Sequence, residues 1–249
     1  LSPIPYFTRL GQRYISALTA PAAEGPLYQV DMRLRPSGNA APLASELTSF
    51  FQYHKNDAWT WERMALTRAR VIFSDHDLRR QIEEAIRAIL TMPQNPDKLL
   101  KDVAEMRIRL LHGRKISGPW DIKNIRGGVV DIEFITQYLQ LQHSPENPSI
   151  LRSNPEQALI ELRSHEILNK NAADQLIKAL KLWRNIQGIT RLTAGDNFDD
   201  QTATSGNCAM LLAGCRAKSI GDLRQKVTKR AASVLKIYQR IIEKPASRL

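Results

Sequence analysis

The chain has 249 residues, of which 43% are hydrophobic and 24% charged, so it can form one large domain or two modest ones around a substantial core. Its 36 lysines and arginines outnumber 25 acidic residues, and the formal net charge of +11 favours anionic partners such as nucleotides, nucleic acid or an acidic protein surface. No stretch approaches the roughly 20 apolar residues of a membrane helix, and no secretory leader is visible, so we expect a cytoplasmic protein without a membrane partner.

Two further features of the sequence concern its ends and its thiols. The first residue is Leu1 and not Met, which leads us to expect a fragment of a longer protein. Cys208 and Cys215 fall in one predicted helix, where their separation along the axis is about 10 Å, too far for a disulfide. We therefore expect two buried, reduced thiols.

Residues 6–20 predict an amphipathic helix, and residues 27–39 predict a strand that ends in a Pro-Ser-Gly-Asn turn. The strand pattern alternates between an apolar side and a polar side that carries Asp31, Arg33 and Arg35. Four residues of strand span about 13 Å, which is the reach of a divalent metal plus the phosphates of a nucleotide. The pattern alone leaves two interpretations open, a solvated sheet surface with cross-strand ion pairs or a phosphate and metal site.

From residue 44 onward the chain is predicted to be helical, with no further convincing strand. The predicted helices cover residues 44–55, 58–70, 74–89, 97–111, 129–141, 155–164, 172–192, 205–214 and 219–243. We accordingly expect an α+β chain with two domains, residues 1–73 containing the strand and residues 74–249 forming an all-helical bundle. Because a lone strand forms no sheet, its partners should lie outside this sequence.

Residues 120–141 form the second unusual stretch, in which Gly127 and Gly128 precede a helix whose first turns carry Asp131 and Glu133. Paired glycines at a helix start allow the close approach of another backbone or of an anion. The stretch therefore predicts either a tight helix–helix junction or, together with Lys123, a contact surface or support for a site. The amides of Gln137 and Gln140 share a face with Glu133 and favour the second interpretation.

Several common sites are missing from the sequence. It has neither a Walker-type loop nor a dinucleotide-binding glycine motif, and no Ser-His-Asp or Cys-His arrangement. The helix at residues 219–243 is basic but lacks interleaved aromatic residues, so nucleic-acid binding is only a weak inference.

Three segments together resemble glutamine synthetase adenylyltransferase, a bacterial enzyme of nitrogen control. They are Val-Asp-Met-Arg-Leu-Arg-Pro-Ser-Gly at 30–38, Ala-Trp-Thr-Trp-Glu-Arg-Met-Ala-Leu-Thr-Arg-Ala-Arg at 58–70 and Asp-Ile-Lys-Asn-Ile-Arg-Gly-Gly-Val-Val-Asp-Ile-Glu-Phe at 121–134. The resemblance implies transfer of AMP from ATP to a tyrosine of glutamine synthetase, and its wording is closest to the C-terminal, adenylylating half of that enzyme. It also implies that residues 1–73 are the C-terminal remnant of a polymerase-beta-like nucleotidyltransferase domain.

The resemblance further implies roles for the polar side of the predicted strand. Asp31 matches the third metal-binding carboxylate of the family and would be catalytic, while Arg33 and Arg35 would bind phosphate. The cofactor would be Mg²⁺, which prefers several oxygen ligands in octahedral geometry. The family's Gly-Ser motif and strand-borne Asp-x-Asp pair are not found ahead of Asp31, so we expect the chain alone to be inactive.

A second hypothesis treats the helical part as a binding module without catalysis of its own. Its partners would be glutamine synthetase or the PII signal protein, with Lys123, Gly127, Gly128, Asp131 and Glu133 at or near the contact.

Overall fold

The computed structural model of the chain describes residues 3–23, 25–26, 29–113, 116, 118–193, 195 and 198–249. It separates into two compact units, Leu1–Leu90 and Thr91–Leu249. The domain boundary expected after residue 73 falls inside the first unit, because the helix that follows it packs on earlier helices of that unit.

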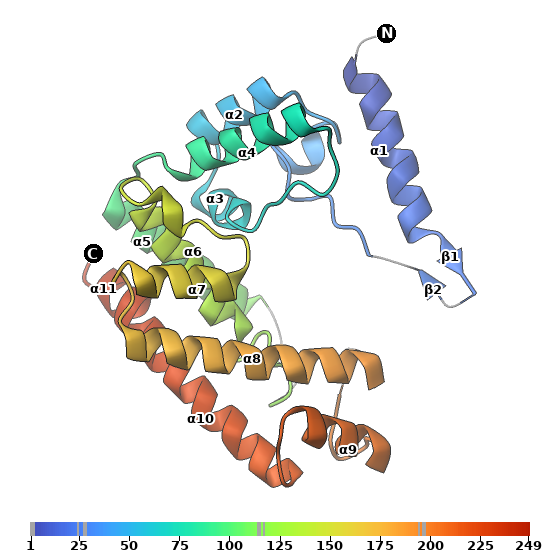
Figure 1. The fold of residues 1–249 in the computed structure, drawn as a ribbon, viewed down its shortest axis with the longest axis vertical. Coiled ribbons are helices and arrows are strands. Elements are labelled where there is room, and N and C mark those ends of the chain that lie inside the picture. Colours follow the sequence, from blue (N-terminus) through green and yellow to red (C-terminus); the bar gives the residue numbers. More distant parts are fainter. Residues whose placement is uncertain are drawn as a thin grey trace. The chain divides into compact units, whose positions relative to one another are not determined.

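In the part of the first unit that the structure describes, the chain forms four α-helices and a minimal hairpin. Figure 1 shows α1 to α4 with β1 and β2. In chain order its described elements are α1 (Pro3–Thr19), β1 (Pro21–Ala22), β2 (Gly25–Pro26), η1 (Gly38–Ala40), α2 (Leu47–Asn56), α3 (Thr60–Leu66) and α4 (His76–Leu90). Helix α4 packs against α2 and α3. Ile89 and Leu90 of α4 are buried, as are Met64 and Leu66 of α3. Helix α1, in contrast, buries none of its residues.

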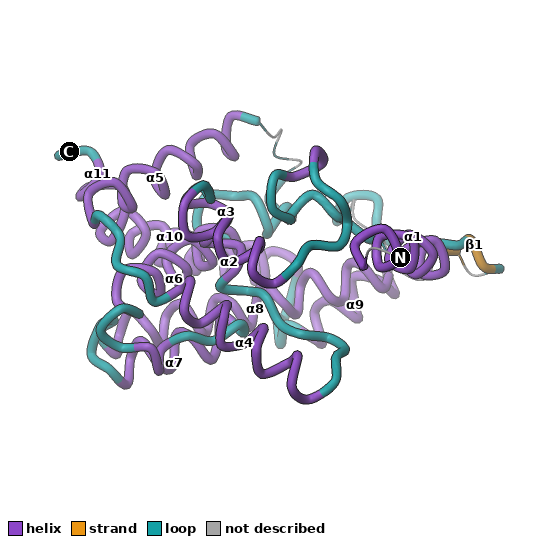
Figure 2. Tube along the Cα trace, turned by 90° about the horizontal axis from the view of Figure 1, so that it is seen from above, coloured by secondary structure: helices purple, strands orange, loops and turns teal. Residues whose placement is uncertain are grey.

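The predicted α+β fold with a nucleotidyltransferase remnant is wrong, because the described part of the chain is all-α. Residues 29–33 have no regular structure, and the only paired strands that the structure describes are the two-residue β1 and β2 (Figure 2). The alternating pattern finds no partner strand to pair with. Instead, the Asp31 carboxylate accepts a hydrogen bond from the backbone N of Arg33, and such local bonds compete with a strand ladder.

The second unit is a bundle of helices. In chain order its described elements are α5 (Pro96–His112), α6 (Val129–His143), η2 (Pro148–Ile150), α7 (Pro155–Ser164), α8 (Lys170–Thr193), α9 (Ser205–Gly214), α10 (Ile220–Tyr238), η3 (Gln239–Glu243) and α11 (Lys244–Ala246). Five of these described helices begin at a side chain that caps them, because Asn95, Asn154, Asn169, Thr204 and Ser219 each accept a bond from a backbone N of the first turn.

Helix α6 is the centre of this bundle. It packs against α5, α7, α8 and α10 (Figure 1). Every residue from Val130 to Leu141 except Glu133 is buried, including the polar Asp131, Thr136, Gln137 and Gln140. Any functional group on α6 is therefore held inside the bundle.

Two expectations about the whole chain can be compared with the structure. Among the described helices, none combines the length and apolar character needed to cross a membrane. Cys208 and Cys215 are both free, as expected, although only Cys215 is buried and Cys208 is half-buried.

Candidate functional site

The carboxylate of Asp31 is held by a single neighbour, Arg33. Atom Oδ1 of Asp31 accepts bonds from the backbone N and the Nε of Arg33, both at 3.0 Å, and Oδ2 accepts from Nη2 at 2.6 Å. The hydrogen bonds from Arg33 lower the pKa of Asp31 from its ordinary value to about 2. Both side chains are more than half exposed, so this charged pair is open to solvent.

Arg35 does not join this pair. Its Nε donates to the carbonyl of Ala41 at 3.2 Å, and its Nη1 donates to the carbonyl of Met32, so the guanidinium braces the turn that follows Asp31. The sequence placed Asp31, Arg33 and Arg35 on one side of a strand. The structure brings only Asp31 and Arg33 together.

The described residues around Asp31 do not fit a magnesium site. Magnesium needs near-octahedral oxygen coordination and usually more than one carboxylate. The structure describes no group of three or more His, Cys, Asp or Glu side chains that could hold a metal, and both oxygens of Asp31 are occupied by Arg33. Additional carboxylates would be required.

A cleft of about 290 Å³ lies in the first unit beside this segment, and we call it the His54 cleft. Its wall combines apolar side chains, a buried histidine, a carboxylate and two guanidiniums. The residues that line it are Leu34, Arg35, Pro36, Phe50, His54, Glu62, Ala65, Leu66, Arg68 and Ala69.

In the second unit, Asp131 forms a buried ion pair with Arg107 of α5. Arg107 Nε lies 2.5 Å from Asp131 Oδ1, and the two side chains are 2% and 0% exposed. The other carboxylate oxygen accepts a bond from the backbone N of Gly127. Asp131 thus ties α5, α6 and the loop before α6 together, and no ligand can reach it without opening the bundle.

Gly127 and Gly128 allow backbones to approach closely. A Cβ built on Gly127, whose φ is +79°, would lie 2.0 Å from the carbonyl oxygen of Ala231 on α10. A Cβ on Gly128 would lie 2.3 Å from the carbonyl oxygen of Ile122. Of the two interpretations left open by the sequence, the geometry matches the tight helix–helix junction.

The remaining predicted contact residues do not form one surface. Lys123 is exposed, whereas Glu133 is half-buried and already engaged with other groups. The amides expected to face a partner, Gln137 and Gln140, are buried, and Gln140 Oε1 accepts a bond from the backbone N of Arg152 at 2.8 Å.

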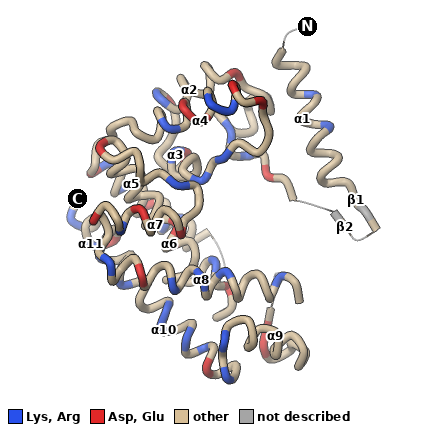
Figure 3. The backbone as a smooth tube through the Cα atoms, in the orientation of Figure 1, with Lys and Arg blue, Asp and Glu red and all other residues tan. Residues whose placement is uncertain are grey.

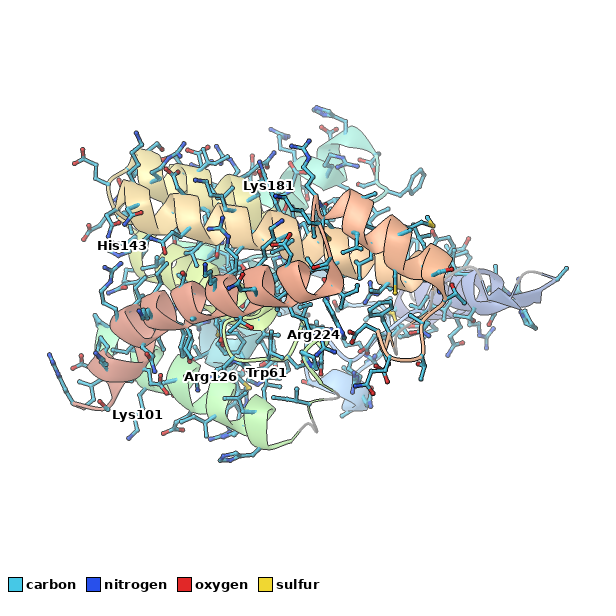
Figure 4. All side chains as sticks on the ribbon, turned by 90° about the horizontal axis from the view of Figure 1, so that it is seen from below. Trp61, Lys101, Arg126, His143, Lys181 and Arg224 are labelled. Atoms are coloured by element: carbon cyan, nitrogen blue, oxygen red, sulfur yellow. The ribbon has the colours of Figure 1, made fainter. Side chains whose placement is uncertain are left out.

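Lys123 instead borders a cleft of about 840 Å³, which we call the Trp120 cleft. There Asp200 accepts bonds from Trp120 Nε1 at 2.8 Å and from Arg224 Nη2 at 2.6 and 2.8 Å. Arg224 comes from α10 and is labelled in Figure 4. Burial alone would raise the pKa of Asp200, but the hydrogen bonds from Arg224 and Trp120 outweigh it and lower the pKa. Phe198 packs edge-on against Trp120, with 5.5 Å between ring centroids.

Positive charge recurs along α10, which carries Arg224, Lys226, Lys229, Arg230 and Lys236 (Figure 3). Two of these cations are neutralised, since Arg224 pairs with Asp200 and Lys226 pairs with Asp222. The helix is therefore less charged than its sequence suggests.

Sequence analysis missed both clefts. His54 sits among apolar helical positions and carries no motif. Asp200 and Trp120 are 80 residues apart, so only folding reveals their hydrogen bond.

Comparison with known proteins assigns the chain to a family. Residues 1–85 match the model of glutamate-ammonia ligase adenylyltransferase, and residues 99–242, more than half of the chain, match that of GlnD PII-uridylyltransferase. The bifunctional glutamine synthetase adenylyltransferase/adenylyl-removing enzyme of Rhodopseudomonas palustris (strain TIE-1) is 41% identical over 95% of this chain. The enzymes of the same name from Bradyrhizobium diazoefficiens and Rhizobium meliloti (strain 1021) are 38% and 39% identical over 97% of it.

The chain belongs to the family whose model, described as GlnD PII-uridylyltransferase, matches more than half of it, and over nearly its whole length it is similar to glutamine synthetase adenylyltransferases. It spans about a quarter of the length of these adenylyltransferase relatives, because the matched region is 24% of the Rhodopseudomonas and Bradyrhizobium enzymes. Similarity to the adenylyltransferase family extends through both units. The resemblance inferred from three short segments is thus confirmed.

Proposed function

We propose that this chain is part of an enzyme that moves AMP from ATP to a tyrosine hydroxyl of glutamine synthetase, in the adenylylating half of that enzyme. The observation that carries the proposal is the 41% identity over 95% of the chain to an enzyme named for this reaction. The proposed setting is the cytoplasm, with neither a membrane nor nucleic acid as partner.

Within this proposal, Asp31 acts on the side of the attacking hydroxyl. A carboxylate whose pKa is about 2 is a weak proton acceptor at neutral pH, so Asp31 would orient and polarise the tyrosine hydroxyl more readily than deprotonate it. The side chain of Arg33 is 78% exposed, so it can bind an incoming phosphate oxygen while it remains paired with Asp31. Arg35 would support phosphate binding through the turn that it braces.

Nucleotidyl transfer in this proposal also uses Mg²⁺, but the described residues do not fit that ion by themselves. Oxygen ligands beyond those of the described residues would be required, and the chain alone is expected to be inactive.

The experiment compares AMP incorporation into glutamine synthetase by this chain and by a longer protein that contains it together with the missing Gly-Ser and Asp-x-Asp elements. With ATP and magnesium, only the longer protein should label glutamine synthetase. Absence of labelling by a folded longer protein would contradict the proposed function.

A second candidate function is a binding module for glutamine synthetase or PII. The match of residues 99–242 to the PII-uridylyltransferase family favours it, because the same helical region recurs in a family named for an enzyme that acts on PII. Lys123 is the exposed member of the predicted contact set.

A pull-down with the whole chain tests this candidate at low salt. Lys123→Glu should reduce retention of the partner, whereas Lys101→Glu, on exposed α5 surface, should not. Retention of neither glutamine synthetase nor PII by the unaltered chain would remove this candidate.

A further inference from the structure

One residue that lines the His54 cleft, His54 itself, has a buried polar atom without a partner among the described residues. His54 is 5% exposed, and its Nδ1 has no hydrogen-bond partner among the described residues. Its ring packs against Phe50 and Tyr53, with centroids 4.6 and 5.5 Å away, so the imidazole is fixed in place. A buried polar atom left unpaired costs free energy, and such atoms in native proteins usually await a water or a ligand.

The protonation state of His54 limits what that atom can bind. Burial lowers the pKa of His54, with the nearby Arg63 adding to the effect and Glu62 opposing it. The imidazole is therefore neutral at pH 7, and Nδ1 offers one neutral hydrogen bond, as donor or acceptor. The edge of a neutral heteroaromatic ring is therefore a better partner for His54 Nδ1 than a charged group.

The walls of the cleft add two further requirements. Phe50 and Leu66 provide apolar faces, and the carboxylate of Glu62 can accept a bond from an amino group although it already binds Tyr53 Oη at 2.9 Å. Arg35 and Arg68 line the same cleft and bring positive charge to it. A volume of about 290 Å³ is at the lower end for small-molecule sites.

We propose that the His54 cleft binds the purine base of the nucleotide substrate, with His54 Nδ1 bonded to the base edge and Arg35 and Arg68 facing its phosphates. This inference rests on the proposed function for its choice of nucleotide. Arg35, four residues after Asp31, holds the turn that follows Asp31, and residues of the same turn line the cleft. The proposal therefore gives this turn a role in nucleotide binding. The base would then be held next to the segment assigned to the attacking hydroxyl.

The test measures equilibrium binding of ATP, adenosine and inorganic tripolyphosphate to the whole chain by calorimetry. His54→Phe removes the hydrogen bond while keeping an aromatic ring, and should weaken ATP and adenosine about tenfold, the equivalent of about 1.4 kcal/mol. Tripolyphosphate, which has no base, should bind His54→Phe and the unaltered chain equally. His143→Phe is the matched control, because His143 is a half-buried histidine of the second unit whose pKa burial also lowers.

A measurement on the unaltered chain guards against a variant that fails to fold. Adenosine should shift the imidazole ¹⁵N resonances of His54 but not those of His143 in a nuclear magnetic resonance titration. Equal affinity of His54→Phe and the unaltered chain for adenosine, or no shift at His54, would overturn the inference. A shift produced by phenol but not by adenosine would also overturn it and assign the cleft to the acceptor tyrosine.

These results separate the inference from the proposed function. His54-dependent binding of adenosine together with no AMP transfer by the longer protein would leave the cleft assignment standing and reject the activity. AMP transfer by the longer protein at the same rate with and without His54→Phe would support the proposed activity and reject the assignment of the cleft.

Discussion

Arg107 and Asp131 form an ion pair inside the second unit, with 2.5 Å between Arg107 Nε and Asp131 Oδ1 and almost no solvent contact at either side chain. The pair joins α5 and α6 through residues that are 24 positions apart in the sequence, and the second carboxylate oxygen of Asp131 accepts a bond from the backbone N of Gly127. Taking two charges out of water is costly, so such a pair stabilises the fold only while both partners are present. It fixes the start of α6.

Removing one member of the pair should therefore destabilise the chain strongly. Arg107→Met is expected to lower the free energy of unfolding by about 3 to 5 kcal/mol, because Asp131 is left buried without its cation. Urea unfolding monitored by circular dichroism measures this. Arg109→Met, on the same helix, removes an exposed pair with Glu105 at 3.3 Å and should cost less than about 1 kcal/mol. Similar decreases in the free energy of unfolding for both variants would mean that the buried pair contributes no more to stability than the exposed pair.

The close approach at Gly127 leads to a second stability prediction. Gly127→Ala should lower the free energy of unfolding by about 2 to 5 kcal/mol, since the residue has a positive φ and its Cβ would overlap the backbone of Ala231. Gly188→Ala is the contrasting variant, because nothing lies within 4 Å of its Cβ in the middle of α8. It should be neutral or stabilise by about 0.5 to 1 kcal/mol. Thermal unfolding that ranks the two variants the other way would contradict this packing.

The helices of the second unit could be predicted because the spacing of apolar residues, the capping residues and the glycines within each segment all indicate the same helix and similar ends. The match is closest for α7 and α9, predicted at residues 155–164 and 205–214 and observed at the same bounds. The strand around Asp31 was not predictable in this way. Alternation describes which residues share a face, but strand formation depends on partner strands, and the described residues supply none for this segment.

The candidate sites show the same division. The Gly127–Gly128 junction could be suspected, since paired glycines before a helix have few roles, although the sequence could not decide between a backbone and an anion as the neighbour. The Arg107–Asp131 pair and the His54 cleft depend on contacts between separate helices and give no local signal. Trp59 and Trp61 show the opposite case, because indole side chains are highly buried on average and yet these two are 68% and 36% exposed.

The ionisation of Asp31 provides a prediction about pH. Its pKa is lowered to about 2 by Arg33, so the stability from this pair is present above the unfolded-state pKa of about 3.9 and is lost as pH falls toward 2. Arg33→Met should raise the pKa of Asp31 toward about 3.9, as measured by carbon-13 titration of the carboxyl group. An unchanged pKa in this variant would show that Arg33 does not hold the carboxylate in solution.

The two thiols should differ in reactivity. Burial raises the pKa of Cys215 to about 11, with Lys226 opposing the effect, so little thiolate forms at pH 8. Cys208 is only half-buried and should react with an aromatic disulfide reagent much earlier. The comparison uses Cys208→Ser and Cys215→Ser separately under native conditions. Faster modification of Cys215 than of Cys208 would contradict the burial of α9's C-terminal end.

The central claim is that Asp31 belongs to the catalytic machinery of an adenylyltransferase. The most direct measurement is the rate of AMP incorporation into glutamine synthetase by the longer protein carrying Asp31→Asn, compared with Asp77→Asn, an exposed acid in the first turn of α4. We predict that Asp31→Asn lowers the rate by at least about a hundredfold while Asp77→Asn leaves it nearly unchanged. A folded Asp31→Asn enzyme that labels glutamine synthetase at the unaltered rate would contradict the role assigned to Asp31.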